Sequence, residues 1–103
     1  SKITQALTMD EHQINELGYQ YLMQKKMPEV ATLIMQFNVD NNPDSVNAYD
    51  SLGDALLGMN NPVKAKESFE KGLSMLKEDN PQIRNLLENN LAKAEKMIAK
   101  LNN

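Results

Sequence analysis

Apolar residues recur at helical spacing in five successive stretches of the chain. In the first stretch, Ile14, Leu17, Gly18, Tyr21 and Leu22 follow the i, i+3, i+4, i+7, i+8 spacing of one helix face. No stretch alternates apolar and polar residues between hairpin turn signals, so the pattern predicts helices and no strand. We therefore expect an all-α protein.

Four prolines separate the five predicted helices. Pro28, Pro43, Pro62 and Pro81 each stand where a helix could begin, because a first helical turn does not need the N–H that proline lacks. Candidate capping residues stand at the predicted starts, among them Asp44, Ser45, Asn61 and Asn80, and Thr8 with Glu11 forms a possible capping box ahead of the first helix. The last predicted helix, from Pro81 to Leu101, is the longest and most polar.

The apolar pattern is an internal repeat. Five positions recur 35 residues later, as the pairs Ile14 and Tyr49, Leu17 and Leu52, Gly18 and Gly53, Tyr21 and Leu56, and Leu22 and Leu57. Pro28 and Pro62 are 34 apart, so the first unit has one extra residue, which we place in its second half. The register of that half stays open, with Ile34 or Met35 opposite Phe69. A period of this size made of two helices predicts hairpins that stack on one another.

At these residues the chain resembles a tetratricopeptide repeat. The run from Tyr49 to Leu56, followed by Ala65, Phe69, Gly72-Leu73 and Pro81, is similar to one nearly complete repeat motif. The resemblance implies one domain with two antiparallel helical hairpins and a capping helix, a fragment of a right-handed α-solenoid. Its parts would be an N-terminal segment 1–8, repeats 9–44 and 45–80, and the capping helix 81–103.

The residue types of the motif suit close packing of two helices. Gly53 and Ala65 would let the two helices of the second hairpin approach closely, and Tyr49 and Phe69 would fill the volume between stacked helices. A larger side chain at position 53, as in Gly53→Leu, would overpack the hairpin and is expected to lower the free energy of unfolding by about 1–3 kcal/mol.

A narrower resemblance favours a different role. Asn38-Val39, Asn42-Pro43-Asp44-Ser45 and the run Asn47 to Gly53 are similar to short repeat tails at the C-terminus of some bacterial serine hydrolases, such as β-lactamase-like proteins and esterases. In that alternative the chain is an accessory or self-association tail, and the catalytic domain lies outside it.

The resemblance also implies where a partner would bind. In tetratricopeptide proteins the first helix of each unit lines a concave groove, which here gives His12, Asn15, Tyr19 and Met23 in the first unit and Asn47, Asp50, Asp54 and Gly58 in the second. Two carboxylates one turn apart favour a peptide with a basic residue beside an apolar one. They would repel the acidic tails that chaperone-binding members of the family hold, so we expect no binding of chaperone C-termini.

Three plainer interpretations of these residues stay open. Asp50 and Asp54 could be solvated surface carboxylates. Tyr19 could be covered by residues 1–8. The seven methionines, which fall mostly in or beside the apolar stripes, could be core gap-fillers and not a binding face.

Composition narrows the classes of function. The chain has 11 Lys and Arg against 14 Asp and Glu, a formal net charge of −3, and no cysteine. The acidic balance disfavours nucleic-acid binding, and no apolar run is long enough to span a membrane. We expect a protein or peptide partner, no cofactor, and a monomer or weak homodimer. The compartment stays open, with a cytoplasmic location favoured and a periplasmic one possible for a tail of an exported hydrolase.

The candidate catalytic residues do not form a site. Asp10, Glu11 and His12 are consecutive, so their side chains diverge by about 100° on a helix. His12 and Glu16 are one turn apart, but two ligands do not make a metal site. Ser51 has no nucleophile elbow or matching histidine base, and we interpret it as a helix surface residue. The chain is therefore predicted not to be an enzyme.

Overall fold

A computed structural model describes residues 9–77 and 80–103, and its regular secondary structure there is entirely helical. The elements are α2 (Glu11–Tyr19), the π-helical turn η1 (Gln20–Gln24), α3 (Pro28–Asn41), α4 (Val46–Gly58), α5 (Pro62–Ser74) and α6 (Pro81–Leu101). No strand occurs in these two ranges. The prediction of an all-α protein is confirmed.

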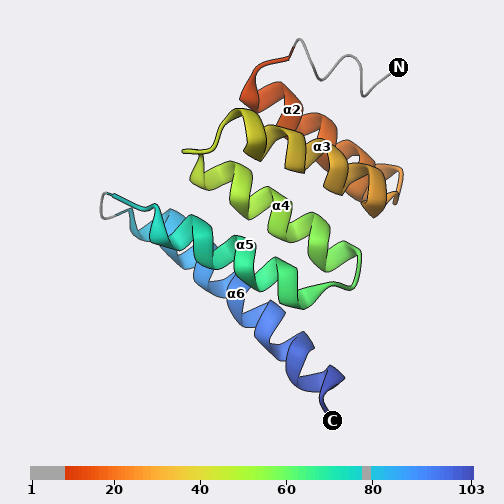
Figure 1. The fold of residues 1–103 in the computed structure, drawn as a ribbon, viewed down its shortest axis with the longest axis vertical. Helices are drawn as coiled ribbons and strands as arrows, with labels where there is room; N and C mark the ends of the chain where they lie inside the picture. The colour runs from red at the N-terminus through yellow and green to blue at the C-terminus, as the bar shows by residue number, and fades with distance from the viewer. Residues whose placement is uncertain (1–8, 78–79) are drawn as a thin grey trace.

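The helices pack in chain order as two layers (Figure 1). Each helix contacts the next one along the chain, and α2 also contacts α4, as α4 contacts α6. In Figure 1, α2, α4 and α6 run in roughly one direction while α3 and α5 return. The molecule measures 41 × 34 × 19 Å, and its short dimension matches two helices of about 10 Å diameter. The layers are therefore α2, α4 and α6 on one side and α3 and α5 on the other.

Most helices begin where the prolines and capping residues predict. Pro28, Pro62 and Pro81 occupy the first turns of α3, α5 and α6. Pro43 is the exception, because it lies in the loop before α4, and Ser45 caps that helix by accepting a hydrogen bond from the backbone N–H of Ala48.

The capping box of α2 differs from the prediction. Asp10 is the N-cap, its carboxylate accepts from the backbone N–H of Gln13 at 2.9 Å, and the Gln13 side chain accepts from the backbone N–H of Asp10 at 3.1 Å. Glu11 is thus the first helical residue and not the third. The predicted partner, Thr8, lies outside the described residues.

The helices of each hairpin approach closely at a glycine. A Cβ placed on Gly53 would lie 2.3 Å from the ring of Phe69, which is fully buried. In the first hairpin a Cβ on Gly18 would lie 2.8 Å from the Met35 side chain. The close approach predicted for Gly53 is therefore confirmed. The open register is settled as well, because Met35 stands opposite Gly18 as Phe69 stands opposite Gly53.

The other predicted packing positions agree with this arrangement. Leu17, Leu52 and Ala65 are buried, while Tyr49 is half-buried and packs against the core. The backbone carbonyl of Tyr49 also accepts a hydrogen bond from the Ser68 hydroxyl at 2.6 Å, which joins α4 to α5.

The extra residue of the first unit lies in η1 and not in the second half of the unit, where it was predicted. The backbone N–H of Met27 donates to the carbonyl of Tyr21, six residues back, whereas the equivalent N–H of Asn61 donates to Leu56, five residues back. A π-helical turn takes up one more residue than an α-helical turn, so η1 absorbs the insertion inside the first helix. Beyond it the two units are again in step, and Lys26 and Asn60, 34 apart, both have positive φ.

Replacing Gly53 tests the close approach. We expect Gly53→Ala to lower the free energy of unfolding by about 1–3 kcal/mol, because the added methyl overlaps the Phe69 ring. Gly72→Ala is the control, since its Cβ would lie 3.2 Å from the Leu87 side chain and 3.6 Å from the Cβ of Tyr49, without the overlap found at Gly53. Its effect should stay within about 1 kcal/mol, because alanine's higher helix propensity offsets the tight contact. Urea unfolding measures both, and equal effects would contradict the close-approach account.

Deleting one residue tests the insertion. Removing the exposed Gln24 lets η1 close as an α-helix, so cooperative unfolding should be retained with a loss of at most about 1 kcal/mol. Removing the equally exposed Glu70 from α5 turns Gly72 by about 100° away from Leu87 and should abolish the cooperative transition. Loss of folding in the Gln24 deletion would show that η1 is required and is not a tolerated insertion.

Candidate functional site

Two side-chain hydrogen bonds connect the helices of the α2, α4, α6 layer. The Tyr19 hydroxyl of α2 donates to Oδ2 of Asp54 on α4 at 2.5 Å. Nδ2 of Asn90 on α6 donates to Oδ1 of Asp50 at 2.8 Å. We call the surface that carries these four residues and Lys93 the inner face. Its centre is polar, although it lies between packed helices.

The two carboxylates of the inner face are not equivalent. Asp50 is 6% exposed, so the interpretation of both groups as solvated surface carboxylates is wrong for this residue. Asp54 is half-buried. Within the described residues, the ion pairs are His12 with Glu16 and Lys66 with Glu95, so neither inner-face carboxylate has a contacting cation.

Burial controls the ionisation of this centre. Loss of solvent raises the pKa of Asp54 to about 6, and the nearby Asp50 charge adds to the effect, while the Tyr19 hydrogen bond and the charge of Lys93 oppose it. Burial also raises the pKa of Asp50, against the Asn90 hydrogen bond and Lys93. The pKa of the Tyr19 phenol is raised by its own burial and by Asp54, so Tyr19 stays protonated and acts as the donor.

The remaining predicted groove residues do not join this cluster. His12 is exposed on the first turn of α2, with its Nε2 3.0 Å from Oε1 of Glu16. Asn47 is exposed on the first turn of α4. Gly58, at the end of α4, faces Leu22 of η1. The structure therefore brings Tyr19, Asp50 and Asp54 together and leaves His12 and Asn47 apart from them.

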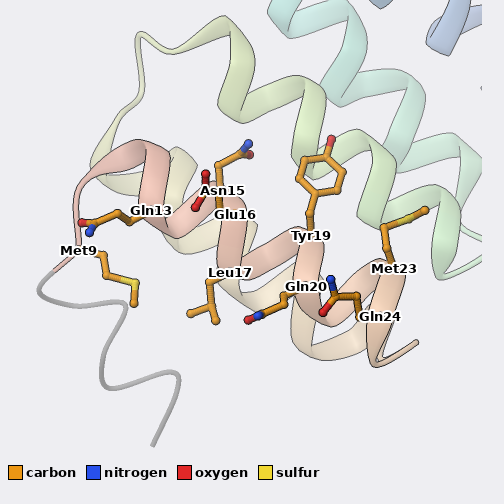
Figure 2. Close-up of a pocket in the computed structure, with 9 residues that line it drawn as sticks. All are labelled: Met9, Gln13, Asn15, Glu16, Leu17, Tyr19, Gln20, Met23 and Gln24. Atoms are coloured by element: carbon orange, nitrogen blue, oxygen red, sulfur yellow. The ribbon is translucent and has the colours of Figure 1, made fainter.

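A groove of about 590 Å³ runs along α2 and η1 beside the inner face. Figure 2 shows Asn15, Tyr19 and Met23 on its side nearest α4, with their side chains directed toward that helix. The described residues that line it are Met9, Gln13, Asn15, Glu16, Leu17, Tyr19, Gln20, Met23 and Gln24. Oδ1 of Asn15 is buried without a hydrogen-bond partner. Three of the predicted groove residues thus line one recess. The alternative in which residues 1–8 cover Tyr19 lies outside the described residues.

Sequence analysis missed the contribution of α6. Asn90 is buried between Leu87 and Ala94 in the apolar stripe of that helix, and the charge of Lys93 opposes the rise in the pKa of both carboxylates. The available signal was a single asparagine at a core position of an otherwise apolar stripe, because a buried amide needs a hydrogen-bond partner.

The residues considered for catalysis are separate from one another. Ser51 is buried, so its interpretation as a helix surface residue is wrong. His12 lies at the exposed start of a different helix. Over residues 9–77 and 80–103, no three His, Asp or Glu side chains are grouped closely enough to hold a metal ion. None of the helices in these ranges combines the length and apolar character needed to cross a bilayer.

No protein-family model, curated protein or solved structure matches this chain.

Titration of Asp54 should make stability depend on pH. Between its ordinary value of 3.8 and the folded value of about 6, the folded state binds more protons than the unfolded state, so stability falls as pH rises through this window. Asp54→Asn removes that loss and keeps an acceptor for Tyr19. The variant's free energy of unfolding relative to the parent should rise by about 1–2 kcal/mol from pH 4 to pH 7, allowing for partial exposure. Urea unfolding at each pH measures this difference. A difference between the variant and the parent that is the same at pH 4 and pH 7 would show that the pKa of Asp54 is not raised by folding.

Proposed function

We propose that the chain is a tetratricopeptide-like, non-catalytic module that binds a peptide or protein segment on its inner face. The repeat of 35 and 34 residues, the matched glycine contacts of the two hairpins and the layer of α2, α4 and α6 support this assignment. In such a module the first helices of successive units form the binding surface.

The observation that carries the proposal is the half-buried Asp54 carboxylate, which has no contacting cation among the described residues. Tyr19 supplies one hydrogen bond, and the nearby Asp50 charge makes ionisation of Asp54 less favourable. A lysine or arginine from a partner would neutralise this position, and a charge-assisted hydrogen bond to a carboxylate is stronger than a neutral one. A basic residue is therefore the partner feature that the inner face favours.

Asp50 has a different role in this proposal. Its Oδ1 is already used by Asn90 and the side chain is almost completely buried. It contributes negative potential to the inner face and holds α6 against α4, while Asp54 meets the ligand. Apolar residues of the partner would lie along the groove beside α2, where Met23 is 66% exposed and has a flexible thioether.

A peptide library tests this function. Nine-residue peptides with randomised flanks and a central lysine, norleucine or glutamate are incubated with the protein, and the bound fractions are sequenced. Lysine-centred peptides should be enriched over both other sets. For the best lysine peptide, Asp54→Asn should weaken binding about tenfold to a hundredfold, because a hydrogen bond to a charged group is lost.

Asp40→Asn is the matched control. It makes the same change of charge on α3, where the exposed Asp40 carboxylate accepts a hydrogen bond from the Gln36 amide at 2.9 Å. Its affinity should stay within twofold of the parent. Equal losses in the two variants would indicate a non-specific effect of net charge, and the absence of lysine enrichment would reject the inner face as a site for basic segments.

A further inference from the structure

The two hairpin turns lie side by side and expose apolar side chains. A Cβ on Gly58, in the last turn of α4, would lie 2.8 Å from Leu22 and 3.4 Å from Pro28, so the end of α4 sits against the turn between η1 and α3. The hydroxyl of Thr32 lies 3.1 Å from the sulfur of Met59. In Figure 1 both turns lie at the same edge of the molecule.

Four large apolar residues are exposed at this edge. Met23 is 66% exposed, Met27 43%, Met59 40% and Val63 54%. They account for half of the described large hydrophobics that are exposed to this degree. The expectation that the methionines are mostly core gap-fillers is thus correct for Met35, which is fully buried, and wrong for these three.

The backbone that presents these side chains is held in place. The N–H of Met27 is bonded to the carbonyl of Tyr21, and the N–H of Asn61 to that of Leu56. The Lys25 ammonium lies 5.5 Å from the centre of the Tyr21 ring. Flexible methionine side chains on a fixed backbone can adapt to different apolar partners at a small entropic cost to the main chain.

Charge along the molecule is distributed unevenly between its two edges. The turns and the first residues of the helices that follow carry Lys25, Lys26 and Lys64 against the single carboxylate Glu29. At the opposite edge, the start of α2 and the loop between α3 and α4 carry Asp10, Glu11, Asp40 and Asp44, and Lys71 of α5 lines one recess with Asp40. The chain as a whole has a net charge of −3, so the positive turn edge runs against the composition.

We propose that this turn-end surface, formed by Met23, Met27, Met59 and Val63 with Lys25, Lys26 and Lys64, docks an acidic amphipathic helix of a partner protein. Apolar side chains on one face of that helix contact the methionines and Val63, and its Asp and Glu residues face the lysines. An exposed apolar patch with charged residues around it is typical of an interaction surface, and charge complementarity selects the sign of the partner.

This surface is separate from the proposed peptide site at Asp54, which selects the opposite charge. Met23 lies where the two regions meet, so one partner with a basic segment followed by an acidic helix could use both. The two proposals nevertheless fail independently, because the site at Asp54 is tested with basic peptides and the turn-end surface with an acidic peptide.

The methionines themselves provide the test. The protein is labelled with ¹³C-methyl methionine and titrated with an 18-residue peptide that has Leu at i, i+3, i+4 and i+7 spacing and Glu elsewhere. The methyl resonances of Met23, Met27 and Met59 should shift, while that of the buried Met35 stays unchanged and reports an intact fold. A peptide with Lys in place of Glu should bind at least tenfold more weakly.

Two charge variants separate this surface from general electrostatics. Lys25→Glu with Lys64→Glu should weaken binding of the acidic peptide at least tenfold. Lys96→Glu with Lys100→Glu makes the same change of charge on α6 and should alter the affinity less than threefold.

Four outcomes would overturn the proposal: no methyl shifts at 1 mM acidic peptide, equal binding of the basic peptide, shifts that grow with protein concentration alone, or shifts caused by phosphatidylserine vesicles and not by the peptide. The third outcome would assign the surface to a second copy of the chain, and the fourth to an anionic membrane.

Discussion

The packing of Phe69 against the backbone of α4 is the contact on which the rest of the structure depends. Gly53 leaves room for the ring, so α4 and α5 approach until the Ser68 hydroxyl reaches the carbonyl of Tyr49. That approach fixes the rotation of α4 about its axis. With Gly53 turned toward Phe69, the neighbouring Asp54 is directed toward Tyr19 of α2, and Asp50 toward Asn90 of α6. The polar inner face is therefore a consequence of the apolar contact on an adjacent side of the same helix.

The first hairpin reaches the same geometry with a less regular sequence. Met35 takes the place of the aromatic ring, and its unbranched side chain fills the space beside Gly18. The additional residue is confined to η1, so Tyr19 before it keeps its spacing of 35 to Asp54, while Pro28 after it has a spacing of 34 to Pro62. An insertion placed in α3 would have rotated Ala31 and Met35 away from α2. Its location in a π-helical turn is what keeps both faces of the repeat in register.

Much of the fold follows from the sequence, because helix periodicity, prolines and glycine contacts are local or are repeated along the chain. The pairing of Tyr19 with Asp54 could also be anticipated, since the two positions differ by one repeat period. The contact of Asp50 with Asn90 could not, because α6 does not continue the repeat spacing and their separation of 40 residues matches no period. The burial of Ser51 was missed for a related reason, as a small polar side chain beside a stripe carries no signal of which neighbour covers it.

The two carboxylates of the inner face raise a question of stability, because burying a charge without a cation is unfavourable. An apolar pair at these positions would be expected to stabilise the array. For Asp50 the hydrogen bond to Asn90 offers a structural reason, since it fixes how α6 sits on α4. The structure gives less reason for a carboxylate at position 54, because the Tyr19 hydroxyl could donate equally well to a neutral amide there. A partly desolvated carboxylate beside a second one attracts a cation more strongly than a fully solvated group does. The basic partner proposed above would bring the positive charge that Asp54 does not find among the described residues.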